Sequence, residues 1–412
     1  MPQELFDLGQ YPEPGIVPKL MHAQVIRDSR MGEPCSAFKH EIVPVPEIGP
    51  NDILVNIMAS GVNYNNIWAA LGIPINVIDM QRKKNEAEDF HIAGSDASGI
   101  VWKTGSNVKN VSIGDEVVIS CGCWEENDPY VKAGKDPVFA PSFLIWGYQT
   151  NYGSLAQYAR VKEHQCFPKP KHLTWEEAAV YMLSAATAYR MLLGWPGNTV
   201  RPGDPVLIWG GAGGLGSMAI QIARISGGRP IAVVSSEDKY EYCSQLGAEG
   251  VINRKNFNHW GTMPDWDNKK NYAKWLEGVK EFGREIWKTL GQKENPAIVI
   301  EHPGEETLPT SIYIVDTGGM VAICGGTTGY YASFDLRYHW MQQKRLQGTN
   351  YANQEECRMV NYLITNKIIH HCLTKVYSFE ETARCHQSMY ENTNMHGKTA
   401  ILINALKRKE II

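Results

Sequence analysis

The stretch GAGGLG, residues 211–216, has the residue types and the spacing that bind the pyrophosphate of a dinucleotide. It fits the pattern G-x-G-x-x-G, follows the apolar run VLIW (206–209) and opens a helical pattern. Glycines here permit a tight turn and a close approach of the backbone, while free N–H groups at the start of the helix bind phosphate. The alternative is a glycine-rich turn without a ligand. The residues predicted to contact the cofactor are Gly211, Gly213, Gly214, Leu215 and Gly216.

The residues after the second strand of this unit select the dinucleotide. An Asp or Glu at that point would accept hydrogen bonds from the ribose hydroxyls of NAD. This strand instead ends in Ser235 and Ser236, and Lys239 follows shortly after, although acidic residues stand at 237–238. Small hydroxyls and a cation suit a 2′-phosphate, so the sequence predicts NADPH. Arg254 is either a second cation of this site or an ordinary surface arginine.

A third stretch, LIWGYQTNYGS (144–154), places the neutral amide of Gln149 among aromatic rings. A buried amide needs partners for its donors and its acceptor. Gln149 is therefore either satisfied by its own backbone or faces a polar ligand, and the stretch itself does not decide between them.

Short strands surround these residues in the first part of the chain. Alternating apolar and polar residues with frequent turn signals predict a mostly antiparallel β domain, with strands in HAQVIRD (22–28), HEIVPVPE (40–47), DILVNIMASG (52–61), GSDASGIVWKTG (94–105), GDEVVIS (114–120) and SLAQYARV (154–161). The period then changes, and residues 174–194 predict one helix with Thr174 as its N-cap, Glu177 three residues later and Gly194 near its end.

A βαβ unit follows that helix, and later apolar runs extend it into a parallel sheet. These runs are PAIVIEHPG (296–304), GGMVAICGG (318–326) and KRLQGTNYAN (344–353), while 252–295 reads as an irregular loop followed by an amphipathic helix. The last part of the chain predicts helix, strand, helix and strand, which return to the first domain. The fold class is therefore α/β, with a Rossmann-type doubly wound sheet and a second, mostly antiparallel domain.

Composition restricts the class of protein. A length of 412 residues with 43% apolar residues predicts two domains, and 40 basic against 44 acidic residues leave a net charge of -4 without long charged runs. This balance argues against nucleic-acid and membrane partners. With no secretory signal and no long apolar span, the chain is interpreted as cytoplasmic, and KRKE (407–410) as a solvated tail.

The chain offers no convincing metal-ligand pattern. Its nine cysteines are scattered, and the close pair Cys121 and Cys123 lacks the second pair of a four-cysteine zinc site. His370 and His371 are expected on a strand, where neighbouring side chains point to opposite faces. The sequence therefore predicts no metal.

At this point the sequence resembles the medium-chain dehydrogenase/reductase superfamily. The resemblance is carried by GSDASGIVWKTGSNVKNVSIGDEVV (94–118), ATAY (186–189) and the glycine turn, and covers roughly residues 40–405. It implies a GroES-like catalytic domain over 1–188 and 352–412 and a Rossmann NADPH-binding domain over 189–351. The superfamily's zinc alcohol dehydrogenases would have Cys where this chain has Asn63, and His-Glu where it has Ser95-Asp96. Neither replacement leaves a competent zinc set.

A closer resemblance is to the crotonyl-CoA carboxylase/reductases. Stretches similar to that family include MASGVNYNNIWA (58–69), IWGYQTNYGSLAQYARV (145–161), VLIWGGAGGLGS (206–217) and RYHWMQQKRLQGTNYAN (337–353). The resemblance implies transfer of a hydride from NADPH to the β-carbon of a short 2-enoyl-CoA, such as acryloyl-CoA or crotonyl-CoA. The thioester enolate that results is then quenched at its α-carbon.

The family quenches this enolate with CO2, and the resemblance assigns four positions to the CO2 pocket. Asn63 matches the family's asparagine, whereas Tyr148 stands at its phenylalanine, Gln149 at its glutamate and Asn350 at its histidine. Neutral amides replace a charged acceptor and a donor, and Tyr148 adds a hydroxyl to an apolar position. The sequence thus predicts a reductase whose enolate is protonated, with carboxylation weak or absent. Asn63 is expected to donate to the thioester oxygen or the enolate.

Further roles follow from the same resemblance. Tyr64, Tyr148 or a water that they hold could protonate the α-carbon, and residues 71–90 are expected to form a lid whose volume the sequence does not disclose. A homo-oligomer, tetramer or dimer, is expected by analogy. Positions that match those lining the nicotinamide are Thr187, His302, Cys324 and Gly325.

Three other functions are consistent with the same sequence features. The chain could be a true reductive carboxylase that tolerates amides, a zinc-independent NADPH:quinone reductase, or a dinucleotide-binding protein without catalysis. Products formed with and without bicarbonate separate the first from a reductase. Quinone turnover would indicate the second, and stoichiometric NADPH binding without turnover the third.

Overall fold

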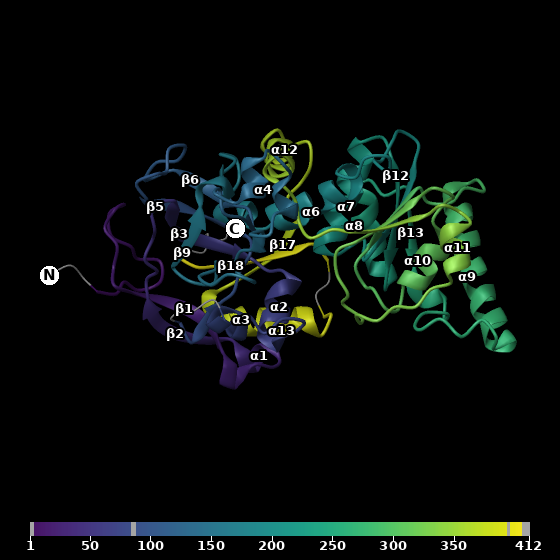
Figure 1. Ribbon diagram of the computed structural model, residues 1–412, viewed down its shortest axis with the longest axis horizontal. Helices are drawn as coiled ribbons and strands as arrows, with labels where there is room; N and C mark the ends of the chain where they lie inside the picture. The colour runs from purple at the N-terminus through teal and green to yellow at the C-terminus, as the bar shows by residue number, and fades with distance from the viewer. Residues whose placement is uncertain (1–3, 84–87, 394–395, 406–412) are drawn as a thin grey trace, which may run out of the picture.

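Two groups of strands and helices make up the computed structural model, which describes residues 4–83, 88–393 and 396–405. Figure 1 shows the first group, which contains the N-terminal elements in purple and blue and the C-terminal elements in yellow, beside the second, which contains the middle of the chain in teal and green. Part of the predicted lid, 84–87, and the KRKE tail lie outside the described residues.

A seven-stranded sheet forms the centre of the first group. Its order is β10-β6-β5-β3-β18-β17, and β9 also pairs with β3. The pairs are antiparallel except for β17 with β18, so the predicted mostly antiparallel sheet is confirmed. The strands are β3 (Asp52–Gly61), β5 (Ala97–Thr104), β6 (Glu116–Ile119), β9 (Tyr158–Lys162), β10 (Cys166–Pro168), β17 (Leu373–Tyr377) and β18 (Lys398–Leu402).

Smaller elements complete this group. A second sheet has the order β2-β1-β4, and β7 pairs with β8. These strands are β1 (Leu20–Arg27), β2 (Lys39–Pro44), β4 (Phe90–Ile92), β7 (Gly122–Cys123) and β8 (Leu144–Ile145). The helices of this group include α1 (Pro34–Ala37), α2 (Tyr64–Leu71), α3 (Val77–Lys83), α4 (Pro129–Lys132), α12 (Gln354–Thr365) and α13 (Thr382–Tyr390). Figure 1 shows α13 and β18, in yellow, among the purple and blue N-terminal elements, as the sequence predicts.

The second group is a six-stranded parallel sheet with the order β13-β12-β11-β14-β15-β16. This is the strand order of a dinucleotide-binding fold, whose ligand site lies at the carboxyl ends of the strands. The strands are β11 (Pro205–Trp209), β12 (Arg229–Val234), β13 (Gly250–Asn253), β14 (Ile298–Glu301), β15 (Met320–Ile323) and β16 (Arg345–Gly348).

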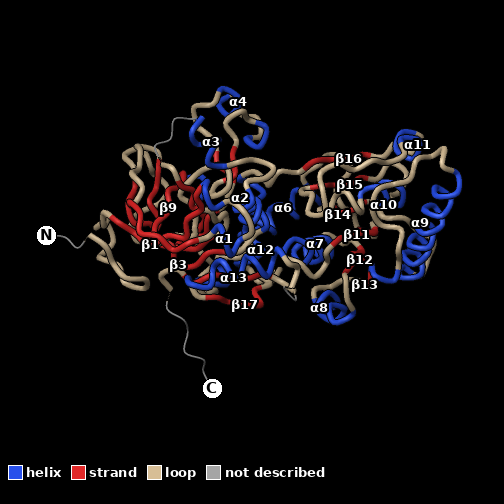
Figure 2. Tube along the Cα trace, turned by 90° about the horizontal axis from the view of Figure 1, so that it is seen from below, coloured by secondary structure: helices blue, strands red, loops and turns tan. Residues whose placement is uncertain are grey.

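Alternate residues of these strands face two separate apolar cores. Val206 and Ile208 belong to the core shared with α7 (Gly214–Ile225), whereas Leu207 and Trp209 face α9 (Lys269–Leu290) and α10 (Leu308–Ile314). Figure 2 shows the strands of this sheet between helices of both layers. This arrangement follows from the period of two along a strand, and it confirms the doubly wound sheet. The second group also contains α8 (Tyr240–Gln245) and α11 (Leu336–Trp340).

The single helix predicted over 174–194 is wrong, because the chain breaks it into α5 (Trp175–Ala178) and α6 (Met182–Leu193). Thr174 and Glu177 do form the predicted capping box. At the break, the amide of Leu183 donates to Asp96 Oδ1 at 3.4 Å. Gly61 makes room for this junction, since a Cβ there would lie 2.3 Å from the Ala179 carbonyl oxygen. Tertiary contacts therefore override the helical period at this point.

The expectation that His370 and His371 lie on a strand is also wrong. His370 and His371 precede β17, and their ring centroids lie 4.0 Å apart. Within residues 4–83, 88–393 and 396–405, no group of three or more His, Cys, Asp or Glu side chains could hold a metal ion. No helix in the same ranges is both long enough and apolar enough to cross a bilayer.

The two sheets support a division into two domains. We propose the boundaries expected from the sequence, with 189–351 as the cofactor domain and 1–188 with 352–412 as the catalytic domain. All six strands of the parallel sheet lie inside 189–351, while residue 188 lies within the continuous helix α6. Helix α6 packs against α7 and α12 and so joins the two domains.

Candidate active site

The glycine turn lies between β11 and α7, where glycine is required by close packing. A Cβ on Gly211 would lie 2.5 Å from Cβ of Ala232, and one on Gly216 would lie 2.3 Å from the Gly210 carbonyl oxygen. Gly213 is the exposed N-cap of α7 and offers no side chain to the first N–H groups of the helix. These amides therefore remain available for a phosphate ligand.

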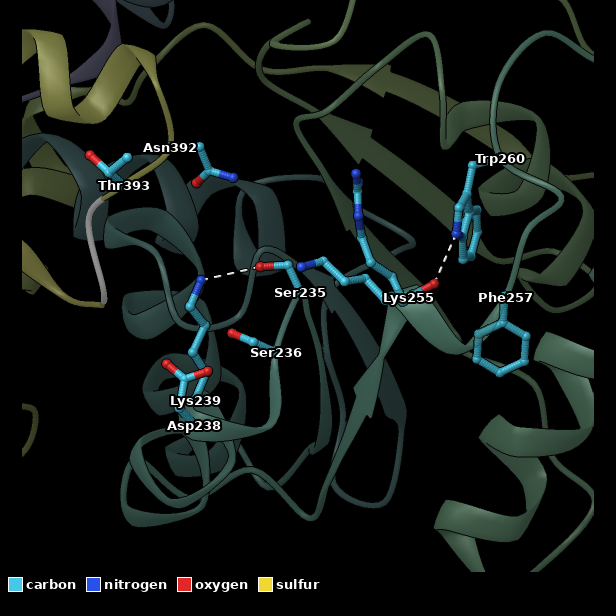
Figure 3. Close-up of a pocket in the computed structure, with 10 residues that line it drawn as sticks. Ser235, Ser236, Asp238, Lys239, Lys255, Phe257, Trp260, Asn392 and Thr393 are labelled. Carbon is cyan, nitrogen blue, oxygen red and sulfur yellow. Dashed lines mark hydrogen bonds between the residues drawn. The ribbon is translucent and has the colours of Figure 1, made fainter.

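A pocket of about 710 Å³ begins at the end of β12. Ser235 and Ser236 line it, and Lys239 Nζ donates to Ser235 Oγ at 3.2 Å. Figure 3 shows this bond and, across the pocket, Asn392 and Thr393 from the segment that follows α13. The serines and the lysine are thus together, as expected for residues that read a 2′-phosphate.

Two more cations line the same pocket. Arg254 is half-buried and its Nη2 lies 3.4 Å from Glu306 Oε2. Lys255, the next residue in the chain, also lines the pocket. The Ser236 hydroxyl holds the pKa of Asp238 below its ordinary value. Asp238 is the one acidic residue among those lining the pocket, against three cations, of which Arg254 is also paired with Glu306. This excess of positive charge favours a phosphate over an uncharged ribose hydroxyl.

The residues expected around the nicotinamide come from three elements. His302 and Cys324 follow the carboxyl ends of β14 and β15, and Thr187 lies on α6. Burial lowers the pKa of His302 to about 4, so its imidazole is neutral at pH 7. A Cβ on Gly210 would lie 2.5 Å from His302 Nε2, which places this ring against the glycine turn. Thr187 Oγ1 donates to the Leu183 carbonyl within its own helix at 2.8 Å.

Asn63 is the N-cap of α2, but its side chain does not cap the helix. Its Oδ1 accepts from Lys398 Nζ at 2.6 Å, and its Nδ2 donates to Asp96 Oδ2 at 3.4 Å. Asn63 is 6% exposed, so this amide is buried. One N–H of Nδ2 remains available for a ligand.

A catalytic zinc ion does not fit this place. Zinc requires three or four nitrogen, sulfur or carboxylate ligands, whereas Asn63 and Asp96 are here bound to the cation of Lys398. The third family position, Ser95, accepts from Asn65 Nδ2 at 2.7 Å. The donor set therefore suits a lysine-centred hydrogen-bond cluster and not a metal.

The remaining residues predicted for the carbon dioxide pocket differ in their environments. Gln149 is half-buried, and its Oε1 accepts from the Ile145 amide at 3.0 Å, so its acceptor is satisfied by its own loop. Asn350 is exposed. Tyr148 is 8% exposed, and its hydroxyl has no hydrogen bond to any described residue that satisfies normal geometry. Burial raises the pKa of Tyr148 to about 12, helped by Tyr330 and opposed by the backbone of Ile75.

An aromatic group connects Asn63's helix with this loop and with the cofactor domain. The ring of Trp68 on α2 lies 5.5 Å from Tyr64 and 6.5 Å from Tyr148, centroid to centroid. A Cβ on Gly325 would lie 3.6 Å from Trp68 Cη2, so the indole touches the predicted nicotinamide loop. Burial, followed by Tyr390 and Tyr330, raises the pKa of Tyr64. Neither Gln149 nor Asn350 hydrogen-bonds to Asn63 within the described part of the chain.

Sequence reasoning missed Lys255, Trp68 and above all Lys398. A lysine at the start of the apolar strand KTAIL is a signal that could have been noticed, because fully buried lysines are rare unless they are paired. Asp96, the partner of this lysine, was noted only because the zinc alcohol dehydrogenases have a different residue at its position. Their contact joins residues 302 positions apart, which no local pattern reveals.

Comparison with known proteins agrees with this geometry. Residues 49–171 match the alcohol dehydrogenase GroES-like domain family, and residues 214–366 match the zinc-binding dehydrogenase family. The fold and the site thus define an oxidoreductase of the medium-chain dehydrogenase/reductase superfamily.

Three relatives narrow the family. A crotonyl-CoA carboxylase/reductase of Cereibacter sphaeroides is 46% identical over 98% of this chain and 92% of its own. A solved crotonyl-CoA carboxylase/reductase in complex with NADP is 50% identical, with a TM-score of 0.94 over 98% of this chain and 100% of that one. A 2-octenoyl-CoA carboxylase reductase, solved with NADP and 2-octenoyl-CoA, is 34% identical, with a TM-score of 0.88 over 96% and 90%.

The chain belongs to the crotonyl-CoA carboxylase/reductase family. The resemblance read from the sequence is therefore confirmed, as are the two-domain fold and the oxidoreductase class. The roles of the individual site residues remain predictions.

Proposed function

We propose that this protein is an enoyl-CoA reductase that protonates its enolate and carboxylates it weakly or not at all. The protein is an NADPH-dependent oxidoreductase acting on the CH–CH group of an acyl-CoA thioester, as its family implies. The proposal concerns the fate of the enolate. One observation carries it: Gln149 is neutral and its side-chain oxygen accepts from the Ile145 amide at 3.0 Å, so this position has no anionic acceptor and its amide oxygen is already engaged.

The replaced positions weaken each contact that a carbon dioxide pocket requires. A glutamate could hold an ordered water as a charged acceptor, whereas Gln149 is neutral and already engaged. Asn350 supplies a neutral amide in place of an imidazole donor, and it is exposed to solvent. Without these contacts, carbon dioxide is not immobilised next to the α-carbon.

Tyr148 adds a second reason. Its buried hydroxyl has no well-formed partner among the described residues, so it can bind a water where a phenylalanine would exclude one. With a pKa raised to about 12, this hydroxyl is protonated at neutral pH. Tyr148, Tyr64 or a water that they hold can therefore donate the proton that the α-carbon takes up.

The chain's residues have distinct tasks in this proposal. Bound NADPH supplies the hydride that adds to the β-carbon. Asn63 donates an N–H to the thioester oxygen, where negative charge develops as the electrons of the double bond move toward the carbonyl. The glycine turn and the cations Lys239, Arg254 and Lys255 hold the cofactor phosphates. Thr187, His302, Cys324 and Gly325 line the nicotinamide.

A short acyl chain, acryloyl or crotonyl, suits the aromatic group beside Asn63. The ring centroid of Trp68 lies 5.5 Å from that of Tyr64 and 6.5 Å from that of Tyr148, and Tyr330 helps to raise the pKa of both tyrosines. These rings leave less room for a long acyl chain than smaller side chains would. Product formation from crotonyl-CoA, hexenoyl-CoA and octenoyl-CoA would measure this restriction.

The test is product analysis with excess bicarbonate and carbonic anhydrase. NADPH oxidation is followed with acryloyl-CoA and crotonyl-CoA, and each product is identified by mass with ¹³C-labelled bicarbonate. We expect the saturated acyl-CoA as the main product in both conditions. A methylmalonyl- or ethylmalonyl-type product as the main species would refute the proposal, and quinone turnover without any thioester reduction would refute the substrate class.

Variants that restore the family's pocket residues can be compared with a matched control. The double variant Gln149→Glu with Asn350→His is expected to raise the carboxylated fraction, because it returns a charged acceptor and a donor to the positions that the resemblance assigns. The control variant Glu281→Gln changes an exposed side chain on α9 and should leave the product ratio unchanged.

A second candidate is a true reductive carboxylase. It is favoured by the retained Asn63 and by relatives at 46% and 50% identity that are crotonyl-CoA carboxylase/reductases. The same labelled products decide between the two functions.

The proposal includes a homo-oligomer. Edge strand β16 is unpaired on one side within the described sheet, and exposed apolar residues of the segment that precedes it offer a contact surface, namely Tyr331, Leu336, Trp340 and Met341. Light scattering should give a mass that is a multiple of 46.2 kDa.

A further inference from the structure

A buried ion pair lies beneath Asn63, at the junction of the two domains. The side chains of Lys398 and Asp96 are 3% and 0% exposed, and Lys398 Nζ lies 3.8 Å from Asp96 Oδ2. Lys398 begins β18, Asp96 precedes β5, and neither belongs to the cofactor pocket. A buried pair of this kind is weak support for stability, because removing two charges from water is costly. The role of the Lys398–Asp96 pair is therefore to be found in its contacts with neighbouring residues.

Lys398 Nζ has three hydrogen-bond acceptors, one for each N–H of an ammonium group. Its Nζ donates to Asn63 Oδ1 at 2.6 Å, to Ser184 Oγ at 3.0 Å and to the Val62 carbonyl at 3.4 Å. An ammonium has three N–H donors and no acceptor, so these three bonds use all of them. Lys398 thus has no proton left for a ligand and acts through its neighbours.

Asp96 is held as an acceptor from two sides. Its Oδ2 accepts from Asn63 Nδ2 at 3.4 Å, and its Oδ1 accepts from the Leu183 amide at 3.4 Å. Leu183 lies in the first turn of α6, where the helix dipole favours a negative charge. Burial raises the pKa of Asp96 to about 7, and the Lys398 cation and these hydrogen bonds oppose the rise, so the anionic form of Asp96 depends on them. The break between α5 and α6 therefore brings the Leu183 amide to Asp96.

Together the two charges fix the orientation of the Asn63 amide. The cation faces its oxygen and the anion faces its nitrogen. A flip of the amide would place the oxygen against the carboxylate and the N–H groups against the ammonium, and both contacts would become repulsive. Asn63 also forgoes the helix-capping bond that its position would permit.

We propose that Lys398 and Asp96 are positioning residues that hold Asn63 in the one orientation that presents its free N–H to the thioester oxygen. This inference rests on the proposed role of Asn63, and it applies whether the enolate afterwards receives a proton or carbon dioxide. The stem of Lys398 also passes the glycine turn, since a Cβ on Gly214 would lie 2.6 Å from Lys398 Cδ. The same side chain thus connects the cofactor loop with Asn63.

The test is a double-mutant cycle measured by NADPH oxidation under saturating cofactor. Lys398→Met keeps an unbranched stem and removes the charge, and we expect kcat to fall about hundred- to thousand-fold, the range for loss of an oriented oxyanion donor. Asn63→Ala should cost at least as much. In the double variant the two losses should not multiply, because Lys398 acts only through Asn63. Multiplied losses would overturn the proposal.

Controls separate positioning from general damage. Lys344→Met removes another buried lysine, whose Nζ donates to the carbonyls of Ile312 and Tyr313, and it should retain kcat. NADPH affinity, measured by fluorescence, should change less than kcat in Lys398→Met, and Lys398→Arg should recover part of the activity. If Lys398→Met does not fold, Asp96→Asn provides the same cycle with Asn63→Ala.

The outcomes are distinguishable from those of the proposed function. Mass analysis reports the fate of the enolate, whereas the cycle reports hydride transfer. A carboxylated product with non-multiplying losses would refute the proposed function and leave the positioning role intact. Full activity of Asn63→Ala would overturn the positioning role, whichever product forms.

Discussion

Glu301 should make the stability of the cofactor domain depend on pH. This carboxyl is fully buried at the end of β14, where Oε1 accepts from Thr307 Oγ1 at 2.7 Å and Oε2 accepts from Ser311 Oγ at 2.6 Å. Burial raises its pKa from 4.5 to about 7, and these hydrogen bonds only partly oppose the rise. Since the folded state binds this proton more tightly than the unfolded state, stability is present at low pH and lost as pH rises through about 7.

The gap between 4.5 and about 7 corresponds to roughly 3 kcal/mol at 1.36 kcal/mol per pH unit. Most of it, about 2 to 3 kcal/mol, is lost between about pH 5 and about pH 8. The isosteric variant Glu301→Gln has no such proton. Relative to the natural protein, the variant should therefore become more stable by that amount across this interval, because other titrating groups cancel in the difference.

Urea unfolding of both proteins at three pH values measures this difference. Glu281→Gln, an exposed glutamate on α9 of the same domain, provides the control and should show a constant difference from the natural protein. Parallel pH profiles for the natural protein and Glu301→Gln would show that Glu301 is ionised in the folded state, and would refute the reasoning from burial.

Three further predictions concern the site and its support. Lys239→Ala should raise KM for NADPH about ten-fold, with little effect on NADH, because only the 2′-phosphate loses a charged partner; initial rates with both cofactors measure this. Arg190→Met should lower stability by about 3–5 kcal/mol, since it leaves Glu356, 2.9 Å away, buried without its cation. Because burial raises the pKa of Glu356, part of this loss should return as pH falls, which denaturation at pH values on either side of neutrality would show. Tyr148→Phe should raise the carboxylated share of product in labelled bicarbonate, because the hydroxyl that binds water is removed; an unchanged share would exclude that role.

Much of the fold is predictable because its signals are local. The period of two in 52–61 indicates β3, and the glycine turn between an apolar strand and a helix indicates the cofactor unit. The serines and Lys239 follow β12 directly, so their meeting in one pocket needed no knowledge of distant contacts. The break at 179–181 was not predictable, since its cause is Asp96, which lies far away in the sequence.

In the candidate site, too, the sequence indicates some residues, while their contacts are visible only in the structure. Residue types predict a neutral amide at Gln149, but only the folded loop shows that its oxygen is bound to Ile145. Asn63 could be singled out by resemblance, yet nothing near it in the sequence indicates the cation that holds it. That cation lies at position 398, on the strand that returns from the end of the chain.

The sequence by itself determined the family, the cofactor and the order of the elements, because glycine spacing, strand period and short motifs act over a few residues. The tertiary structure decided how Lys398, Asp96 and Asn63 meet. Electrostatic contacts between buried groups depend on distance in space and on the exclusion of water, and neither is encoded by position along the chain.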